Sequence, residues 1–214
     1  MKRWGCIFIV SAVSLALTGC IDIFQHLIID ADGLVRTTIR VTISKAVFAM
    51  ADGLSEDDAD FEEIFNENDL NNMDLDRYDQ FGTSFEKIND STDAGYLLSM
   101  NIDYRDQDMV NSINKADISF IPRFGKRDIT IPIDLLDGSY GSSGDDAMAL
   151  AFMSTGKYRL LINKNIMADI GRAVVFAGNE ETELTVLDLY NDFLVEIPLS
   201  ILITSAVDLK LYAK

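Results

Sequence analysis

Strict alternation of side-chain character near the N-terminus constrains the fold more than any other feature of this chain. Residues 35–43 place Val, Thr or Ile at every odd position, with Arg or Thr between them. This period of two is typical of a strand with one buried face. A second apolar stretch covers residues 23–30, and Asp32-Gly33 between the two is a dipeptide that favours tight turns. The sequence therefore predicts a β-hairpin over residues 23–43.

Further strands are expected wherever similar short apolar or alternating runs recur, namely at 96–105, 117–121, 128–135, 158–163, 183–189, 193–203 and 207–212. Helical spacing of apolar residues predicts short helices over 44–54, 107–115, a stretch following Ser143 or Asp145, and 165–176, although Val174-Val175-Phe176 fits the start of a strand equally well. Pro132 indicates a strand edge or a bulge, because proline cannot donate to a ladder.

These elements predict an α+β fold. Because elements close in sequence usually pair, we expect a mostly antiparallel, curved sheet of about eight strands with several short helices packed on it. Residues 55–80 interrupt this pattern with a strongly acidic stretch, whose scattered apolar residues indicate an excursion that packs lightly on the domain.

The N-terminus has the layout of a bacterial secretory signal. Lys2 and Arg3 precede an apolar run over 4–17, and Leu17-Thr18-Gly19-Cys20 follows. The run of about 14 residues is shorter than the roughly 20 needed to span a bilayer. Leu17-Thr18-Gly19-Cys20 resembles the lipobox of bacterial lipoproteins. The resemblance implies that residues 1–19 are removed, that Cys20 is lipidated, and that 20–214 form a single envelope domain anchored to a membrane, the outer one in a diderm host.

The order of elements also resembles the LppM-type bacterial lipoproteins. The shared layout is the lipobox, the Asp32-Gly33 hairpin running into Ser44-Lys45-Ala46, and the later block Tyr158–Ile162. The resemblance implies an α+β envelope domain associated with lipid or glycolipid binding. It carries no binding residue to a particular position of this chain.

Charge and cysteine content exclude several functions. The chain carries a net charge of −17, and loss of Lys2 and Arg3 with the signal leaves −19. Nucleic acid is an unfavourable partner for such a chain, because binding needs basic residues to neutralise phosphates. Cys6 would leave with the signal and Cys20 would carry lipid, so we expect no disulfide and no thiolate site.

No motif indicates catalysis or a cofactor. The single histidine, His26, lies in an apolar strand and is interpreted as structural packing. Asp74, Asp76 and Asp79 suggest a calcium loop, but Asp79 stands where an EF-hand needs glycine. The glycine-rich stretch Gly138–Gly144 lacks the Lys-Ser/Thr of a phosphate-binding loop and is followed by two aspartates. We therefore expect no metal, no cofactor and no enzymatic activity.

Two functions remain. One is a lipid-anchored envelope protein that binds a lipid or another amphipathic ligand near the membrane, in a space between sheet and helices. The alternative is a non-enzymatic interaction or structural lipoprotein that holds a protein partner through its acidic surface or a sheet edge.

Overall fold

The computed structural model describes residues 21–30, 32–46, 81–116, 118–135 and 156–214. Within these residues the chain forms twelve strands and two helices. Their bounds are β1 Ile21–Ile29, β2 Val35–Ser44, β3 Ser84–Asn89, β4 Asp93–Ile102, α6 Gln107–Ala116, β5 Arg123–Phe124, β6 Asp128–Ile133, β7 Lys157–Asn163, β8 Ile170–Ala177, β9 Glu180–Leu184, β10 Val186–Asp188, β11 Asp192–Pro198, α8 Leu199–Leu202 and β12 Val207–Ala213.

The strands form two sheets and not one. The large sheet has seven strands in the order β10-β11-β7-β1-β2-β4-β3, and the small sheet has five in the order β5-β6-β12-β8-β9. The expectation of a single sheet of about eight strands was therefore wrong. The α+β class holds only loosely, because strands dominate the described residues. Pairing is antiparallel throughout except between β1 and β7, which are parallel and far apart in sequence.

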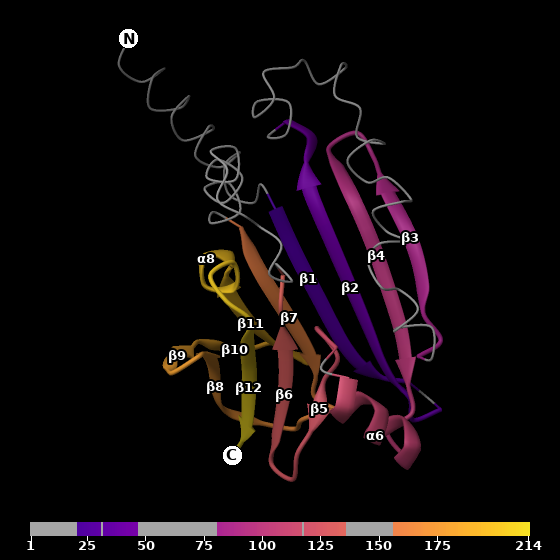
Figure 1. Ribbon diagram of the computed structural model, residues 1–214, viewed down its shortest axis with the longest axis vertical. Helices are drawn as coiled ribbons and strands as arrows, with labels where there is room; N and C mark the ends of the chain where they lie inside the picture. Colours follow the sequence, from indigo (N-terminus) through magenta and orange to yellow (C-terminus); the bar gives the residue numbers. More distant parts are fainter. Residues whose placement is uncertain (1–20, 31, 47–80, 117, 136–155) are drawn as a thin grey trace.

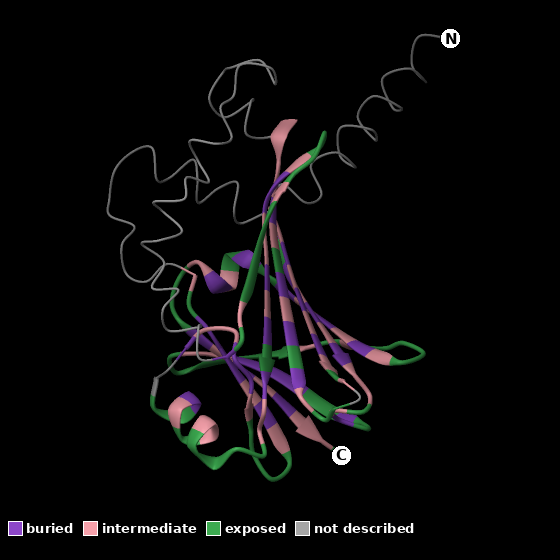
Figure 2. Ribbon diagram, turned by 90° about the vertical axis from the view of Figure 1, so that its right-hand side faces the viewer, coloured by how far each residue is buried: buried purple, intermediate pink, exposed green. Residues whose placement is uncertain are grey.

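The core lies where the two sheets face each other. One face of the large sheet contributes Ile23, Leu27, Leu160 and Val195, and the small sheet contributes Ile131, Val175, Leu209 and Leu211. Each of these side chains stabilises the fold by about 1.5–3 kcal/mol through removal from water. Figure 1 shows the small sheet lying against the lower half of the large one, and buried residues gather in that half in Figure 2.

The β1–β2 hairpin forms as predicted, and its turn has a clear local cause. Asp30 Oδ1 accepts hydrogen bonds from the backbone N–H groups of Asp32 (3.0 Å) and Leu34 (3.1 Å). Gly33 adopts φ 78°, a conformation that residues with a Cβ rarely take. The nine paired positions of β1 and β2 keep alternate residues on the same face.

Helix α6 also forms as predicted. Asp106 caps its first turn, since Asp106 Oδ1 accepts hydrogen bonds from the N–H groups of Asp108 (2.9 Å) and Met109 (3.4 Å). Ile113 is buried, and Met109 packs against the core. Lys115 lies in the last turn, where positive charge interacts favourably with the helix dipole.

Three local expectations were wrong. The helix expected over 165–176 does not form, because strand β8 begins at Ile170. The alternative, a strand that begins at Val174, is closer to the structure. The run expected over 193–203 ends as a strand at Pro198 and continues as helix α8. Residues 118–121 form a turn in place of the strand expected over 117–121, while the unpredicted β3 and β5 each pair with a neighbour.

Pro132 lies in the part of β6 that has a neighbouring strand on one side alone. Strand β5 pairs with Thr130 and Ile129 alone, and Pro132 O accepts a hydrogen bond from Phe120 N at 2.7 Å. The ring nitrogen of Pro132 therefore points to a side of β6 where no strand pairs at this position, and this is why β6 tolerates a proline although it lies between β5 and β12 and is not an edge strand as a whole.

Candidate functional site

The candidate site is the end of the large sheet at which β1 begins. Ile21 is the first residue of β1 and directly follows Cys20. Pairing places Ile21 beside Ile43 and Ile43 beside Ala94, and the next row on the same face holds Ile23, Val41 and Tyr96. We call the six residues of these two rows the apolar end. Both rows lie on the face that carries the core lower down.

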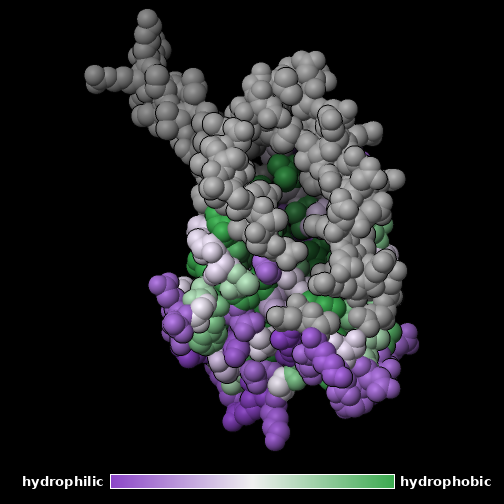
Figure 3. All heavy atoms as spheres, viewed as in Figure 1, coloured by the Kyte–Doolittle hydropathy of each residue, from purple (hydrophilic) through white to green (hydrophobic). Residues whose placement is uncertain are grey.

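The small sheet covers only part of this face. Phe85 of β3 is 37% exposed and stacks on Tyr96, with ring centroids 5.7 Å apart and planes inclined by 26°. Ile21 and Val41 are partly buried and pack on the edge of the core. Figure 3 shows hydrophobic atoms in the middle of this view and hydrophilic atoms gathered over its lower end. The inward face of the large sheet is therefore apolar at its end near Cys20, and Phe85 is its most exposed apolar side chain among those described.

A buried polar trio lies at the boundary between the apolar end and the closed core. Tyr158 Oη donates to Gln25 Oε1 at 2.5 Å, and Gln25 Nε2 donates to the carbonyl oxygen of Phe120 at 2.7 Å. Gln25 and Tyr158 have no exposed surface, and burial raises the pKa of Tyr158 far above its ordinary value. Phe120 adopts φ 64°, which is rare for a residue with a side chain. The trio holds the loop before β5 against the large sheet.

The outer face of the large sheet carries an ion-pair row across three strands. Arg159 of β7 contacts Asp22 of β1 and pairs with Glu196 of β11 through Nε and Oε1 at 2.9 Å. Lys157 Nζ lies 3.1 Å from the other oxygen of Glu196. The Arg159 and Lys157 side chains lower the pKa of Glu196 despite partial burial. The Glu196 carboxylate is thereby held ionised, which suits a structural role.

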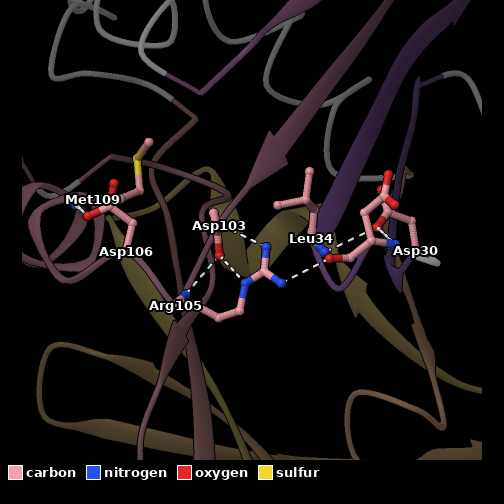
Figure 4. A network of polar contacts seen from close by, with 7 residues as sticks. Asp30, Leu34, Asp103, Arg105, Asp106 and Met109 are labelled. Atoms are coloured by element: carbon pink, nitrogen blue, oxygen red, sulfur yellow. Dashed lines mark hydrogen bonds and ion pairs between the residues drawn. The ribbon is translucent and has the colours of Figure 1, made fainter.

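A second polar network lies at the opposite end of the sheet, where the β1–β2 turn meets the loop before α6 (Figure 4). Arg105 forms a two-point ion pair with Asp103, at 2.7 Å and 2.8 Å, and its Nη1 donates to Asp32 O at 3.0 Å. The Arg105 side chain and its backbone N–H lower the pKa of Asp103 to about 2. This network ties the turn to the loop and leaves Asp103 unsuited to donating a proton.

His26 also lies on the outer face of the large sheet. Its Nε2 is 3.7 Å from Asp192 Oδ1, and its ring centroid is 6.3 Å from that of Phe24. Within the described ranges, no group of three His, Cys, Asp or Glu side chains is arranged to hold a metal ion. No helix in that part of the chain is long and apolar enough to cross a membrane.

Several positions singled out in the sequence lie outside the described residues. These are Cys6, Cys20, the acidic excursion at 55–80 with Asp74, Asp76 and Asp79, and the glycine-rich stretch Gly138–Gly144 with the helix expected after it. Of the predicted helix over 44–54, only Lys45 and Ala46 are described as helical.

The sequence did offer a signal for the buried trio. Gln25 occupies an inward position between Ile23 and Leu27, where a polar residue needs a partner. Its partner, Tyr158, could not be identified from sequence, because β1 and β7 are 133 residues apart at this hydrogen bond and pair in parallel.

Comparison with solved structures finds a distant neighbour. No family model and no curated protein matches the chain. The folded domain of LppM from Mycobacterium tuberculosis, solved by NMR, is similar over 92% of both chains, with 10% sequence identity and a TM-score of 0.39.

Proposed function

We propose that this protein is a lipid-anchored component of the bacterial cell envelope, acylated at Cys20, whose domain binds a lipid or another amphipathic ligand at the apolar end. The observation that carries the proposal is the start of β1 at Ile21. An acyl anchor on the preceding residue would hold the apolar end within a few ångströms of the bilayer, since neighbouring Cα atoms are about 3.8 Å apart.

The chemistry of the apolar end supports an amphipathic ligand. Ile21, Val41 and Ile43 offer aliphatic surface, and the Phe85–Tyr96 stack offers aromatic surface that is partly open. Apolar tails gain about 0.8 kcal/mol for each methylene that leaves water. Lys157 and Lys45 lie at the same end of the sheet, where a polar head group would remain in contact with water.

The same proposal assigns no enzymatic activity. Among the described residues, the carboxyl groups whose pKa departs from the ordinary value are Asp90, Asp103 and Glu196, and all three are lowered. A general acid needs the opposite shift. Tyr104 and Tyr158 have raised pKa values because they are buried, and each donates a hydrogen bond to a fixed partner.

The test compares bound lipid in two matched variants. The full chain is purified from bacterial membranes in a mild detergent, and native mass spectrometry measures non-covalent lipid adducts. Ile43→Glu places a charge on the apolar end, and Ile28→Glu places the same charge on the outer face of the neighbouring strand. We expect a stoichiometric adduct in the natural chain and in Ile28→Glu, and about tenfold less in Ile43→Glu, because a carboxylate disfavours apolar contact.

A natural chain that carries no adduct under any lipid supply would contradict the ligand proposal. An equal loss of adduct in both variants would also contradict it, because the apolar end would then have no special part in binding.

A further inference from the structure

The outer face of the large sheet, which is turned away from the small sheet, carries a patch of apolar side chains. Leu161 of β7 lies beside Leu194 of β11, and Leu194 lies beside Leu187 of β10. Phe24 and Ile28 of β1 occupy the rows on either side. Leu187 is 46% exposed, and the other four side chains are partly exposed. A contiguous apolar patch of this kind is typical of an interaction site.

Charged side chains flank the apolar patch in a regular order. On the outer face β2 carries the cations Arg36 and Arg40, and β11 carries the carboxylates Asp192 and Glu196. β2 and β11 lie on either side of the β1–β7 pair (Figure 1). Register places Arg40 and Glu196 in the row of Phe24, and Arg36 and Asp192 in a row two residues nearer the β1–β2 turn. In each row, therefore, β2 contributes positive charge and β11 contributes negative charge.

This order makes the outer face complementary to itself. A two-fold axis parallel to the strands, midway between β1 and β7, sets β2 of one copy opposite β11 of the other, and β1 opposite β7. Arg40 then faces Glu196 of the second copy, and the charged row nearer the turn pairs in the same way. Asp22 of β1, which lies beside Lys157 of β7, faces Lys157 of the second copy. Symmetry repeats each of these pairs.

The balance of charge on this face favours a second copy over other partners. The chain carries a net charge of −17, so most of its surface repels another copy. Arg40 is exposed and forms no ion pair within the part of the chain that the structure describes. Nucleic acid or anionic lipid would meet the carboxylates of β11, and a basic polypeptide would meet the arginines of β2. On the outer face of β11, β7, β1 and β2, four cations and three carboxylates alternate: Arg36, Arg40, Lys157 and Arg159 with Asp22, Asp192 and Glu196.

The direction of the axis is fixed by the same charges. An axis running across the strands would set β2 opposite β2 and bring Arg40 to Arg36 of the second copy, which is unfavourable. An axis parallel to the strands leaves the direction of β1 unchanged, so both Cys20 residues lie at the same end of the dimer. Both copies could then be anchored in one membrane. That agreement rests on the proposed anchor, whereas the charge pairing does not.

We propose that two copies of this chain form a two-fold dimer in which the outer faces of their large sheets stack with parallel β1 strands. Stacked sheets lie about 10 Å apart with strand directions within about 30° of each other, a separation that arginine and glutamate side chains span together. Phe24, Ile28 and Leu161 lie next to the axis and leave water there. This inference is independent of lipid binding at the apolar end, which lies on the opposite face.

The test measures the dimer Kd of the full chain by sedimentation equilibrium in density-matched detergent micelles. Arg40→Glu sets like charges opposite one another, and Lys126→Glu makes the same change of charge in the exposed turn between β5 and β6. We expect Arg40→Glu to weaken the dimer Kd at least about tenfold and Lys126→Glu to change it by less than about twofold. Adding Glu196→Gln to Arg40→Glu should restore part of the loss, because the opposing carboxylate is then removed.

A natural chain that stays monomeric at every concentration would overturn the proposal. A dimer that Arg40→Glu leaves intact would overturn it too, since the interface would then lie elsewhere, and so would simple additivity in the double variant. The direction of the axis is tested by Ile28→Cys, which lies beside the axis and should be cross-linked to its own image by a bismaleimide of about 10 Å. The natural chain is the control, and a dimer of Ile28→Cys that is not cross-linked would overturn the parallel arrangement.

Discussion

At the scale of single residues, the buried trio of Gln25, Tyr158 and Phe120 ties the loop before β5 to the large sheet. Tyr158→Phe removes the hydroxyl that donates to Gln25 Oε1 and leaves that oxygen buried without this donor. We expect a loss of about 1–3 kcal/mol in the free energy of unfolding, measured by urea titration. Tyr190→Phe, at an exposed position, is the matched control and should change stability by less than about 0.5 kcal/mol.

At Phe120 the backbone conformation predicts which of two substitutions, to glycine or to alanine, leaves the protein more stable. Its positive φ of 64° favours glycine, whereas at ordinary positions alanine is the more favourable of the two. We expect Phe120→Gly to be more stable than Phe120→Ala by about 1 kcal/mol, although both remove the ring. Thermal or urea unfolding of the two variants measures the difference. Greater stability of Phe120→Ala would show that the loop does not hold this conformation.

Asp103 gives a pH dependence. Its pKa is lowered from 3.8 to about 2 in the folded chain, so the ionised form favours folding above about pH 4. This contribution is lost as the pH falls from about 4 to about 2. Urea midpoints measured across this range should fall more steeply for the natural chain than for Asp103→Asn. Parallel curves for the two proteins would show that the ion pair with Arg105 contributes nothing.

At the scale of elements, the β2–β4 pairing depends on a glycine. A Cβ on Gly95 would lie 2.0 Å from Val41 O and 2.9 Å from Thr42 Cα, and neither backbone atom can move without breaking the ladder. We expect Gly95→Ala to destabilise the protein by about 3 kcal/mol or more. Ser99→Ala on the same strand, a partly buried position, is the control. Equal urea midpoints for the two variants would contradict the account.

The sequence predicts elements whose pattern is local and misses those whose pairing is distant. The β1–β2 hairpin and α6 were predicted because Asp32-Gly33 and the apolar spacing of Met109 and Ile113 act over a few residues. β3 has no such pattern, since Glu86 and Lys87 are exposed on an edge strand. The sequence over 165–176 fits a helix, and its last three residues fit a strand equally well. The pairing of Ile170–Ala177 with β12 is what makes this segment a strand.

The candidate site was predictable only in part. Lipidation of Cys20 is predicted from the tripeptide before it and stays a prediction, whereas the apolar end follows from the alternation in β1 and β2. The strands that make up the large sheet could not be predicted, because β7, β11 and β10 join it through the parallel contact between β1 and β7. Local pattern gives no information about contacts between such distant segments.

At the scale of the whole molecule, the two ends of the large sheet differ in character. The apolar end follows Cys20, and the opposite end carries the Asp103–Arg105 network and α6 (Figure 4). The nine residues of β1 separate the two by about 30 Å. With the proposed anchor at Cys20, the apolar end would lie toward the bilayer and the charged loops toward the aqueous compartment.

The most direct test of this account is the intact mass of the full chain expressed in a bacterial host and purified from its membranes. We expect the mass of residues 20–214 plus a diacylglycerol group, and a Cys20→Ser variant that keeps its signal and carries no lipid. An unmodified mass for the natural chain, or processing at another position without lipid, would contradict the central claim.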